Sequence, residues 1–275
     1  MKRQLFAHVS DCLDPLDCSR LPSYLPAEEP VPQLYPWEVY AELRKLKSAK
    51  SCGPDQVPPK LVKEIAYELS VPLTDILNNS YSEGYVPEQK KKAIVIPIPK
   101  QYPPRAERSR NIGTVVLTDF SKAFDLVDHT LLIGKIIDMG VRRSIVPWIC
   151  DFLRNRQQCV RYNSVLSDYT TLHGGVPQGT KFGPIGFQIL INEAAQDAGS
   201  RCWKYVDDFF GGCASPLQGD LDQFSEWASD SHLKLNPSKC QAMQIAFSNP
   251  LPPHRDLRIG TEPLSYVTEA KGASH

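Results

Sequence analysis

The sequence predicts an α+β fold in which helices pack on a largely antiparallel sheet. Strand-like and helix-like stretches follow one another in the order strand, helices, strands, helix, strand, which is typical of this class. One predicted strand ends at Asp119, and a later predicted hairpin carries Asp207 and Asp208 at its tip. The 275 residues are enough to bury a substantial core.

The first part of the chain predicts a linker followed by two short helices. Residues 1–34 mix Pro, Glu, Asp and Ser without sustained periodicity, so we expect a disordered or linker segment. After Tyr35, a helix whose aromatic residues pack in the core is predicted by apolar residues at every third position, namely Trp37, Tyr40, Leu43 and Leu46. A second helical face comprises Leu61, Val62, Ile65, Ala66 and Leu69.

An edge strand is predicted at residues 93–98, because Pro97 and Pro99 lack the amide donors that a central strand needs. The stretch from Glu88 to Arg110 around it carries seven basic and two acidic residues, a local net charge of +5. A run of charge like this one is usually a solvated face.

The central segment predicts a buried strand, two helices and a hairpin. Residues 114–117 are apolar or β-branched and indicate a central strand that ends at Asp119. Asp128 is expected to cap a helix over 131–139, which Gly140 ends. Residues 144–153 predict a further helix with Pro147 in its first turn, and 158–162 with 169–172 predict a hairpin.

The last part of the chain predicts a second hairpin, a helix and a strand. Residues 201–205 and 209–213 form the hairpin, with Asp207 and Asp208 at its tip. An amphipathic helix over 221–228 follows, and residues 241–247 alternate as a strand does.

These acidic residues predict a metal site. Burying a carboxylate at a strand end without a partner costs several kcal/mol, and two such ends side by side repel each other unless a cation lies between them. Magnesium prefers a few carboxylate oxygens together with water and substrate phosphates. The sequence therefore predicts that Asp119, Asp207 and Asp208 hold magnesium, although two aspartates in a turn can also be purely structural.

Composition excludes several classes of protein. Basic and acidic residues number 31 each, so no global field attracts nucleic acid, and any such surface must be local. The eight cysteines form no Cys-x-x-Cys pair and are interpreted as reduced thiols of an intracellular protein, in the nucleus or the cytoplasm. No secretory signal and no stretch of about 18 apolar residues is present, so we expect no membrane partner.

Several motifs in order resemble the reverse transcriptases of non-LTR (LINE-type) retrotransposons. They are 118–125 (TDFSKAFD), 175–180 (GVPQGT) with Gly183 and Pro184, 205–208 (YVDD) and 236–239 (NPSK), preceded by 53–55 (GPD) and 96–100 (IPIPK). The resemblance implies a palm-like antiparallel sheet with packed helices and a partial helical fingers region. It divides the chain into a linker (1–34), partial fingers (35–110), a palm-like catalytic region (111–250) and a truncated segment towards the primer grip (251–275).

The resemblance also implies residue roles. Asp119 and Asp207 would bridge two metal ions, Asp208 would be the third carboxylate or a turn former, and Lys239 would donate a proton to pyrophosphate or lie on the surface. The substrate-binding set would be Phe124, Gln178, Gly179 and Lys100. Phe124 is expected to exclude the ribose 2′-hydroxyl, with an ordinary core role as its alternative.

The implied activity is RNA-directed DNA polymerisation with two magnesium ions, or manganese, on an RNA template, a DNA primer and deoxynucleoside triphosphates. Only ten residues, 101–110, stand where the family has a longer fingers and palm segment, and the chain stops before a thumb. One alternative is therefore an impaired retroelement remnant that binds nucleic acid weakly through 90–110, since the family places its fingers there. Another is a scaffold with a structural acidic hairpin. The oligomeric state is not indicated.

Overall fold

The computed structural model divides the chain into two units, which are described separately. The first contains residues 1–98 and 128–177, and the second contains 99–127 and 178–275. The described residues are 13–20, 30–47, 53–95, 113–162, 165–196, 198–199, 201–205, 208–212, 217–245 and 256–267. The predicted catalytic region 111–250 thus contributes to both units, and the predicted functional boundaries stay predictions.

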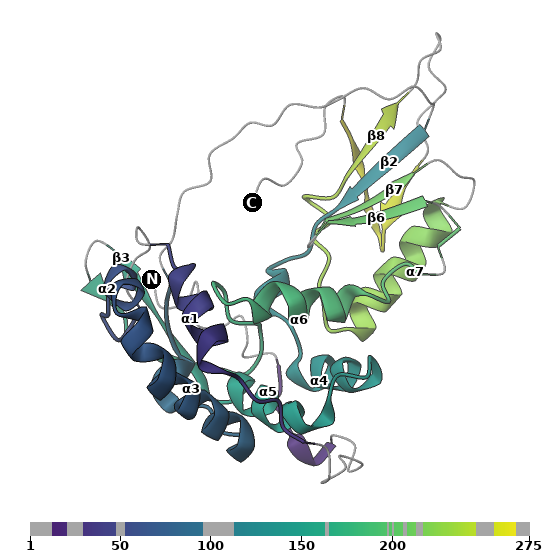
Figure 1. Cartoon of the computed structure of the whole chain (residues 1–275). Helices are drawn as coiled ribbons and strands as arrows, with labels where there is room; N and C mark the ends of the chain where they lie inside the picture. Colours follow the sequence, from purple (N-terminus) through teal and green to yellow (C-terminus); the bar gives the residue numbers. More distant parts are fainter. Residues whose placement is uncertain are drawn as a thin grey trace. The chain divides into compact units, whose positions relative to one another are not determined.

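The first unit begins with three α-helices, α1 (Pro36–Arg44), α2 (Pro59–Glu64) and α3 (Ala66–Glu83), of which α1 packs against α3 (Figure 1). Proline at the start of α1 supplies a preset backbone angle, and Glu38 accepts a hydrogen bond from the Tyr35 amide at 2.9 Å. The single helical face predicted around 61–69 is divided between α2 and α3, because the backbone leaves helical geometry at Ile65.

The aromatic residues of α1 do not form the core, so that prediction is wrong. Trp37 is 64% exposed and Tyr40 is 39% exposed, whereas Val39 is the buried residue of the helix. Trp37 instead stacks on Tyr35 with a centroid distance of 4.3 Å. The three-residue spacing correctly predicted a helix, and Leu43 and Leu46 of the predicted face are partly buried, whereas its two aromatic residues are exposed.

The predicted linker contains residues that pack on the first unit. Leu13 and Leu16 are buried, ahead of a short 3-10 helix, η1 (Cys18–Arg20). Further along, Ser144 donates a hydrogen bond to the carbonyl of Pro30 at 3.2 Å. Two buried leucines and one hydrogen bond in the described part of residues 1–34 thus differ from a fully unpacked linker.

The sheet of the first unit contains β1 (Lys92–Val95), β3 (Arg156–Tyr162), β4 (Val165–Leu166) and β5 (Thr170–Leu172). Strand β1 pairs in parallel with β3 alone, which confirms the predicted edge strand for its described residues. Strands β3 and β5 are antiparallel, with Gln158 opposite Thr170, as the predicted hairpin requires. A short 3-10 helix, η2 (Glu88–Lys91), leads into β1.

Two further helices of the first unit follow the sequence prediction. Asp128 caps α4 (His129–Asp138) by accepting a hydrogen bond from the Leu131 amide at 3.0 Å, and Gly140 beyond the helix has a φ of 74°. Helix α5 (Val146–Leu153) follows η4 (Arg143–Ile145) and carries Pro147 in its first turn.

The second unit is built on a five-stranded sheet in the order β11-β8-β2-β7-β6 (Figure 1). Its strands are β2 (Gly113–Thr118), β6 (Arg201–Tyr205), β7 (Asp208–Gly212), β8 (Gln241–Ile245) and β11 (Ser265–Tyr266). All its pairings are antiparallel except that of β11 with β8. Strand β2 lies at the centre, as predicted, and the sheet with its helices confirms the α+β class.

The remaining elements of the second unit are two helices, a 3-10 turn and a small hairpin. They are η3 (Ala123–Asp125), α6 (Phe182–Ile191), α7 (Leu217–Asp230), β9 (Arg258–Ile259) and β10 (Glu262–Pro263). Helix α7 was predicted, and it buries Leu221, Phe224 and Ala228. Helix α6 was not predicted, because its apolar residues run around the whole helix rather than along one stripe.

Candidate active site

The strand register brings the two acidic segments to the same end of the sheet. In the antiparallel pair of β2 and β7, Leu117 lies opposite Phe210 and Thr118 opposite Phe209. One further step of this register would place Asp119 opposite Asp208, the first residue of β7. The backbone of Asp119 therefore ends beside the Asp208 end of the β6–β7 hairpin. Asp207 and the side chain of Asp208 lie outside the described residues.

The side chain of Asp119 is suited to a cation. It is only 22% exposed, and its Oδ2 atom is shielded from solvent without accepting a hydrogen bond of ordinary geometry. The Lys239 ammonium lies 3.2 Å from this oxygen, as an ion pair rather than a directed hydrogen bond. Within the described part of the chain, this shielded carboxylate oxygen is paired with a positive charge, which fits the donor that a divalent ion requires.

Three acidic ligands are not seen together among the described side chains. Within the ranges that the structure describes, no group of three or more His, Cys, Asp or Glu is arranged to hold a metal. Since Asp207 and the side chain of Asp208 are not described, the predicted metal set stays a prediction. Asp119 is the predicted ligand whose side-chain surroundings are described, and these surroundings fit a divalent cation.

The backbone around Asp119 is held by one segment, residues 234–240. The Asp119 amide donates to the Cys240 thiol at 3.3 Å, and its carbonyl accepts from the Asn236 amide at 2.8 Å. Next along the chain, Phe120 forms a β-bridge with Leu235. Burial raises the pKa of Cys240 to about 11, so the thiol is protonated at neutral pH. Sequence reasoning missed Cys240, whose only signal was its position directly after Lys239.

Phe124, the residue predicted to exclude the ribose 2′-hydroxyl, lies against helix α6. Phe124 is half-buried and stacks on Phe187 of α6, with ring centroids 4.8 Å apart and planes 29° apart. This contact fixes one face of the Phe124 ring and leaves part of the side chain accessible. Packing and a gate function are therefore compatible, and the role of Phe124 stays a prediction.

Gln178 contacts a residue that the sequence analysis did not single out. Its Nε2 donates to Asp125 Oδ1 at 3.2 Å, and both side chains are largely exposed. Partial desolvation of the carboxyl raises the pKa of Asp125, and the Gln178 bond opposes that shift. Because a carboxylate can only accept, the Gln178 amide must point its NH₂ group at Asp125, which directs its carbonyl oxygen away from that carboxylate. Asp125 ends the 118–125 motif, and that position was the available signal.

The other predicted substrate residues are placed differently. Gly179 has a φ of 79°, a conformation that favours glycine, and a Cβ there would meet no atom within 4 Å. Glycine is thus favoured at this position by backbone conformation rather than by lack of space. Lys100 lies outside the described residues.

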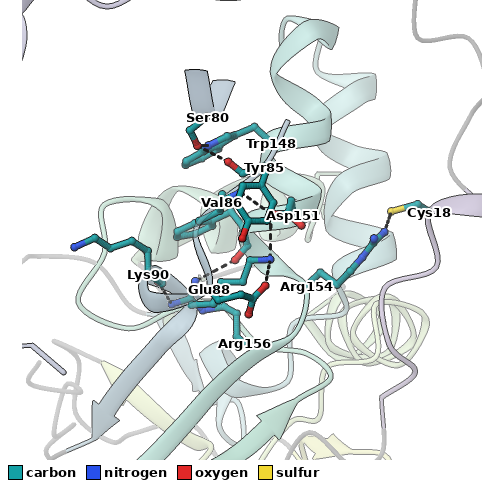
Figure 2. Close-up of polar contacts among 12 residues, drawn as sticks. Cys18, Ser80, Tyr85, Val86, Glu88, Lys90, Trp148, Asp151, Arg154 and Arg156 are labelled. Carbon is teal, nitrogen blue, oxygen red and sulfur yellow. Dashed lines mark hydrogen bonds and ion pairs between the residues drawn. The ribbon is translucent and has the colours of Figure 1, made fainter. Parts of the chain in front are cut away.

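The basic segment is not uniformly available to nucleic acid. Lys91 is only 2% exposed, and its ammonium pairs with Asp151 at 3.1 Å and with Glu88 at 3.2 Å. Asp151 in turn accepts from the Val86 amide at 2.6 Å, so the carboxylate joins η2 to α5 (Figure 2). Lys90 and Lys92 are exposed. The interpretation as a solvated face is therefore wrong for Lys91, which is buried and paired with Asp151 of α5.

The family of the chain is established by sequence. Residues 85–267 match the family described as reverse transcriptase (RNA-dependent DNA polymerase). This match covers more than half of the chain, and the chain belongs to the reverse transcriptase family.

Among the described residues, no helix is long and apolar enough to span a membrane.

Two relatives come from fruit-fly mobile elements, which confirms the resemblance to non-LTR retrotransposons. The probable RNA-directed DNA polymerase from transposon X-element of Drosophila melanogaster is 25% identical over 158 residues, 53% of this chain and 17% of that protein. The RNA-directed DNA polymerase from mobile element jockey of Drosophila funebris is 26% identical over 181 residues, 60% and 19% respectively. The aligned part of the chain thus spans less than a fifth of each relative.

Solved structures with partial likeness include telomerases of two yeasts. The Candida tropicalis enzyme has a TM-score of 0.38 and 12% identity, over 50% of this chain and 26% of that one. The Candida albicans enzyme has a TM-score of 0.37 and 12% identity, over 51% of this chain and 28% of that one.

Proposed function

We propose that this chain carries the catalytic centre of an RNA-directed DNA polymerase that extends a DNA primer on an RNA template. The observation that carries the proposal is the register of β2 and β7, which ends Asp119 beside the Asp208 end of the acidic hairpin. Membership of the reverse transcriptase family supports the same reaction.

Asp119, Asp207 and Asp208 are the proposed ligands of two magnesium ions, with manganese as an alternative. Such ions, when bound, supply charge stabilisation at the attacking and leaving oxygens of phosphoryl transfer. Asp119 contributes an oxygen that is shielded from water and, among the described residues, is bound by no hydrogen-bond donor and is paired with the Lys239 ammonium.

Lys239 is proposed as the proton donor to the departing pyrophosphate. Its side chain is 59% exposed, so its flexible stem can leave Asp119 and reach a neighbouring anion. General-acid assistance of this kind contributes about 10² to 10⁴-fold to a rate. The same lysine can therefore neutralise Asp119 and later serve the substrate.

The nucleotide is proposed to bind near Phe124, Gln178 and Gly179. Phe124 is held from one side by Phe187, so a ring fixed in place can exclude a 2′-hydroxyl by shape. Gln178 presents a carbonyl oxygen whose orientation Asp125 fixes. The hybrid of template and primer would be held by its shape and backbone rather than by base edges.

Primer extension tests the proposal. The full 275-residue chain is given poly(rA), an oligo(dT) primer and thymidine triphosphate with Mg²⁺ or Mn²⁺, beside Asp207→Asn and Asp119→Asn. Incorporation should require the metal and fall by about a hundredfold or more in either variant. Asp230→Asn, an exposed aspartate of α7, is the matched control and should be fully active.

The remaining outcomes separate the alternatives. Template binding without incorporation in any divalent metal would indicate the impaired remnant. Equal incorporation by wild type and Asp207→Asn would exclude the proposed metal ligands and favour a structural hairpin.

A further inference from the structure

Among the described residues, the strands of the sheet supply no hydrogen-bond partner to the Asp119 amide. The ladder between β2 and β8 ends at Leu117 opposite Gln241, and the β2–β7 ladder ends at Thr118 opposite Phe209. A backbone amide left unpaired in a half-buried place costs about 1–3 kcal/mol. Some other group must therefore accept from Asp119.

The Cys240 side chain is that group. Cys240 is 1% exposed, and its sulfur lies 3.3 Å from the Asp119 amide nitrogen and 3.8 Å from the Asp119 carbonyl oxygen. The thiol thus accepts a hydrogen bond from the Asp119 amide and donates one to the Asp119 carbonyl oxygen. Because it is buried, it has little freedom to move away from either.

The turn that carries Cys240 is itself closed by hydrogen bonds. The amides of Lys239 and Cys240 both donate to the carbonyl of Asn236 at 3.0 Å, and the Asn236 amide donates to Asp119. Three residues of one tight turn, Asn236, Lys239 and Cys240, therefore contact the amide, the carbonyl and the carboxylate of Asp119.

We infer that Cys240 is a positioning residue that holds the Asp119 backbone at the end of β2 and thereby sets the affinity of the acidic site for divalent cations. This inference rests on the proposed function, since it needs Asp119 to be a metal ligand. Residues that orient a ligand from behind commonly control metal affinity, because a misplaced carboxylate binds with a poorer angle.

A Mn²⁺ titration of the full chain, followed by the electron paramagnetic resonance signal of free Mn²⁺, tests the inference without substrate. Cys240→Ala should weaken binding by about tenfold, whereas Cys240→Ser, which can still accept from the Asp119 amide, should stay within about threefold of wild type. Cys159→Ala is the matched control, because Cys159 is also 1% exposed and lies in β3 of the other unit. It should lower the unfolding midpoint in urea without changing Mn²⁺ affinity.

Each result decides the inference. Equal Mn²⁺ affinity of Cys240→Ala and Cys159→Ala would overturn it. If Cys240→Ala does not fold, Cys240→Val fills the same space without accepting a hydrogen bond, and equal affinities of the Val and Ser variants would overturn the inference. The Asp119→Asn variant distinguishes failure of the inference about Cys240 from failure of the proposed metal role of Asp119. Loss of binding in Asp119→Asn with normal binding in Cys240→Ala rejects only the inference, whereas normal binding in Asp119→Asn rejects the proposed metal role itself.

Discussion

At the scale of single residues, Asp119 is the best-defined part of the site. Its amide, carbonyl and carboxylate are all contacted by residues 236–240, more than a hundred positions later in the chain. The Lys239 contact has a consequence for cation binding. An ammonium 3.2 Å from Oδ2 occupies the place at which a metal ion would find that oxygen.

Lys239→Met should therefore tighten Mn²⁺ binding while it slows polymerisation. Loss of an exposed ion pair corresponds to about a twofold to fivefold change in affinity, and loss of the proposed proton donor to a drop of about a hundredfold in rate. Equilibrium Mn²⁺ titration and single-nucleotide incorporation measure the two effects. Lys234→Met, an exposed lysine of the same segment, is the control, and weaker Mn²⁺ binding in Lys239→Met would contradict this interpretation.

Phe124→Ala should admit ribonucleotides. Phe187 holds the wild-type ring from one face, so truncation removes the side chain that would meet a 2′-hydroxyl. Discrimination between deoxynucleotides and ribonucleotides, measured as the ratio of kcat/KM values, should fall by about tenfold or more. Unchanged discrimination would leave Phe124 with a packing role only.

At the scale of elements, the first unit depends on buried polar side chains where elements meet. Lys91 joins η2 to α5 through Asp151, and His129 at the start of α4 makes a hydrogen bond of 2.7 Å to the carbonyl of Gly175. The contacts around Asp151 also include Val86, whose amide donates to the carboxylate (Figure 2). These links are between segments about 45 to 65 residues apart in the chain.

Lys91→Met should destabilise the protein strongly. Removing one partner of a buried ion pair leaves Asp151 without its cation and costs about 3 kcal/mol or more. Urea unfolding followed by circular dichroism measures the loss. Lys90→Met changes the neighbouring exposed lysine, whose ion pair with Asp55 is on the surface, and should be nearly neutral. Similar unfolding midpoints for the two variants would show that burial of Lys91 contributes little.

His129 should make stability depend on pH. Burial lowers the pKa of His129, the Gly175 carbonyl bond and Asp128 oppose that shift, and Arg156 adds to it. The unfolded chain therefore takes up a proton near pH 6.5, while folded His129 takes one up only at a lower pH. Stability is fully present above about pH 6.5 and falls as the pH decreases below it. In His129→Gln, the free energy of unfolding between pH 5.5 and 7.5 should lose this slope, and an unchanged slope would contradict the assignment.

At the scale of the whole molecule, each unit is made of two separate stretches of chain. Residues 128–177 belong with the N-terminal 98 residues, while 99–127 belong with the C-terminal part. No single cut therefore separates the units. The predicted catalytic region 111–250 lacks β1, which pairs with β3, and β11, which pairs with β8.

A fragment of residues 111–250 should for this reason fail to fold cooperatively. It loses the strand partner of β3 and leaves Asp151 without Lys91. Urea titration of the fragment should show a broad transition, compared with a sharp one for the full chain. A cooperative transition in the fragment would support the predicted boundaries at residues 110 and 250 as those of an independent domain.

Much of the fold was predictable where the signal is local. Alternating or β-branched residues indicated β2 and β8, and Asp128 and Gly140 marked the ends of α4, because caps and strand periodicity depend on neighbours in sequence. Helix α6 was missed since its apolar residues show no stripe. The exposure of Trp37 and the burial of Lys91 were missed because they depend on which distant surfaces each side chain meets.

The sequence by itself determined the α+β class, the family motifs and the aspartates proposed as metal ligands, since these follow from residue type and spacing. Only the tertiary structure decided that Asp119 ends beside the Asp208 end of the hairpin, that Lys239 and Cys240 contact it, and that Gln178 is oriented by Asp125. Contacts between residues 53 to 121 positions apart arise from strand register and packing. No local pattern in a single sequence encodes them.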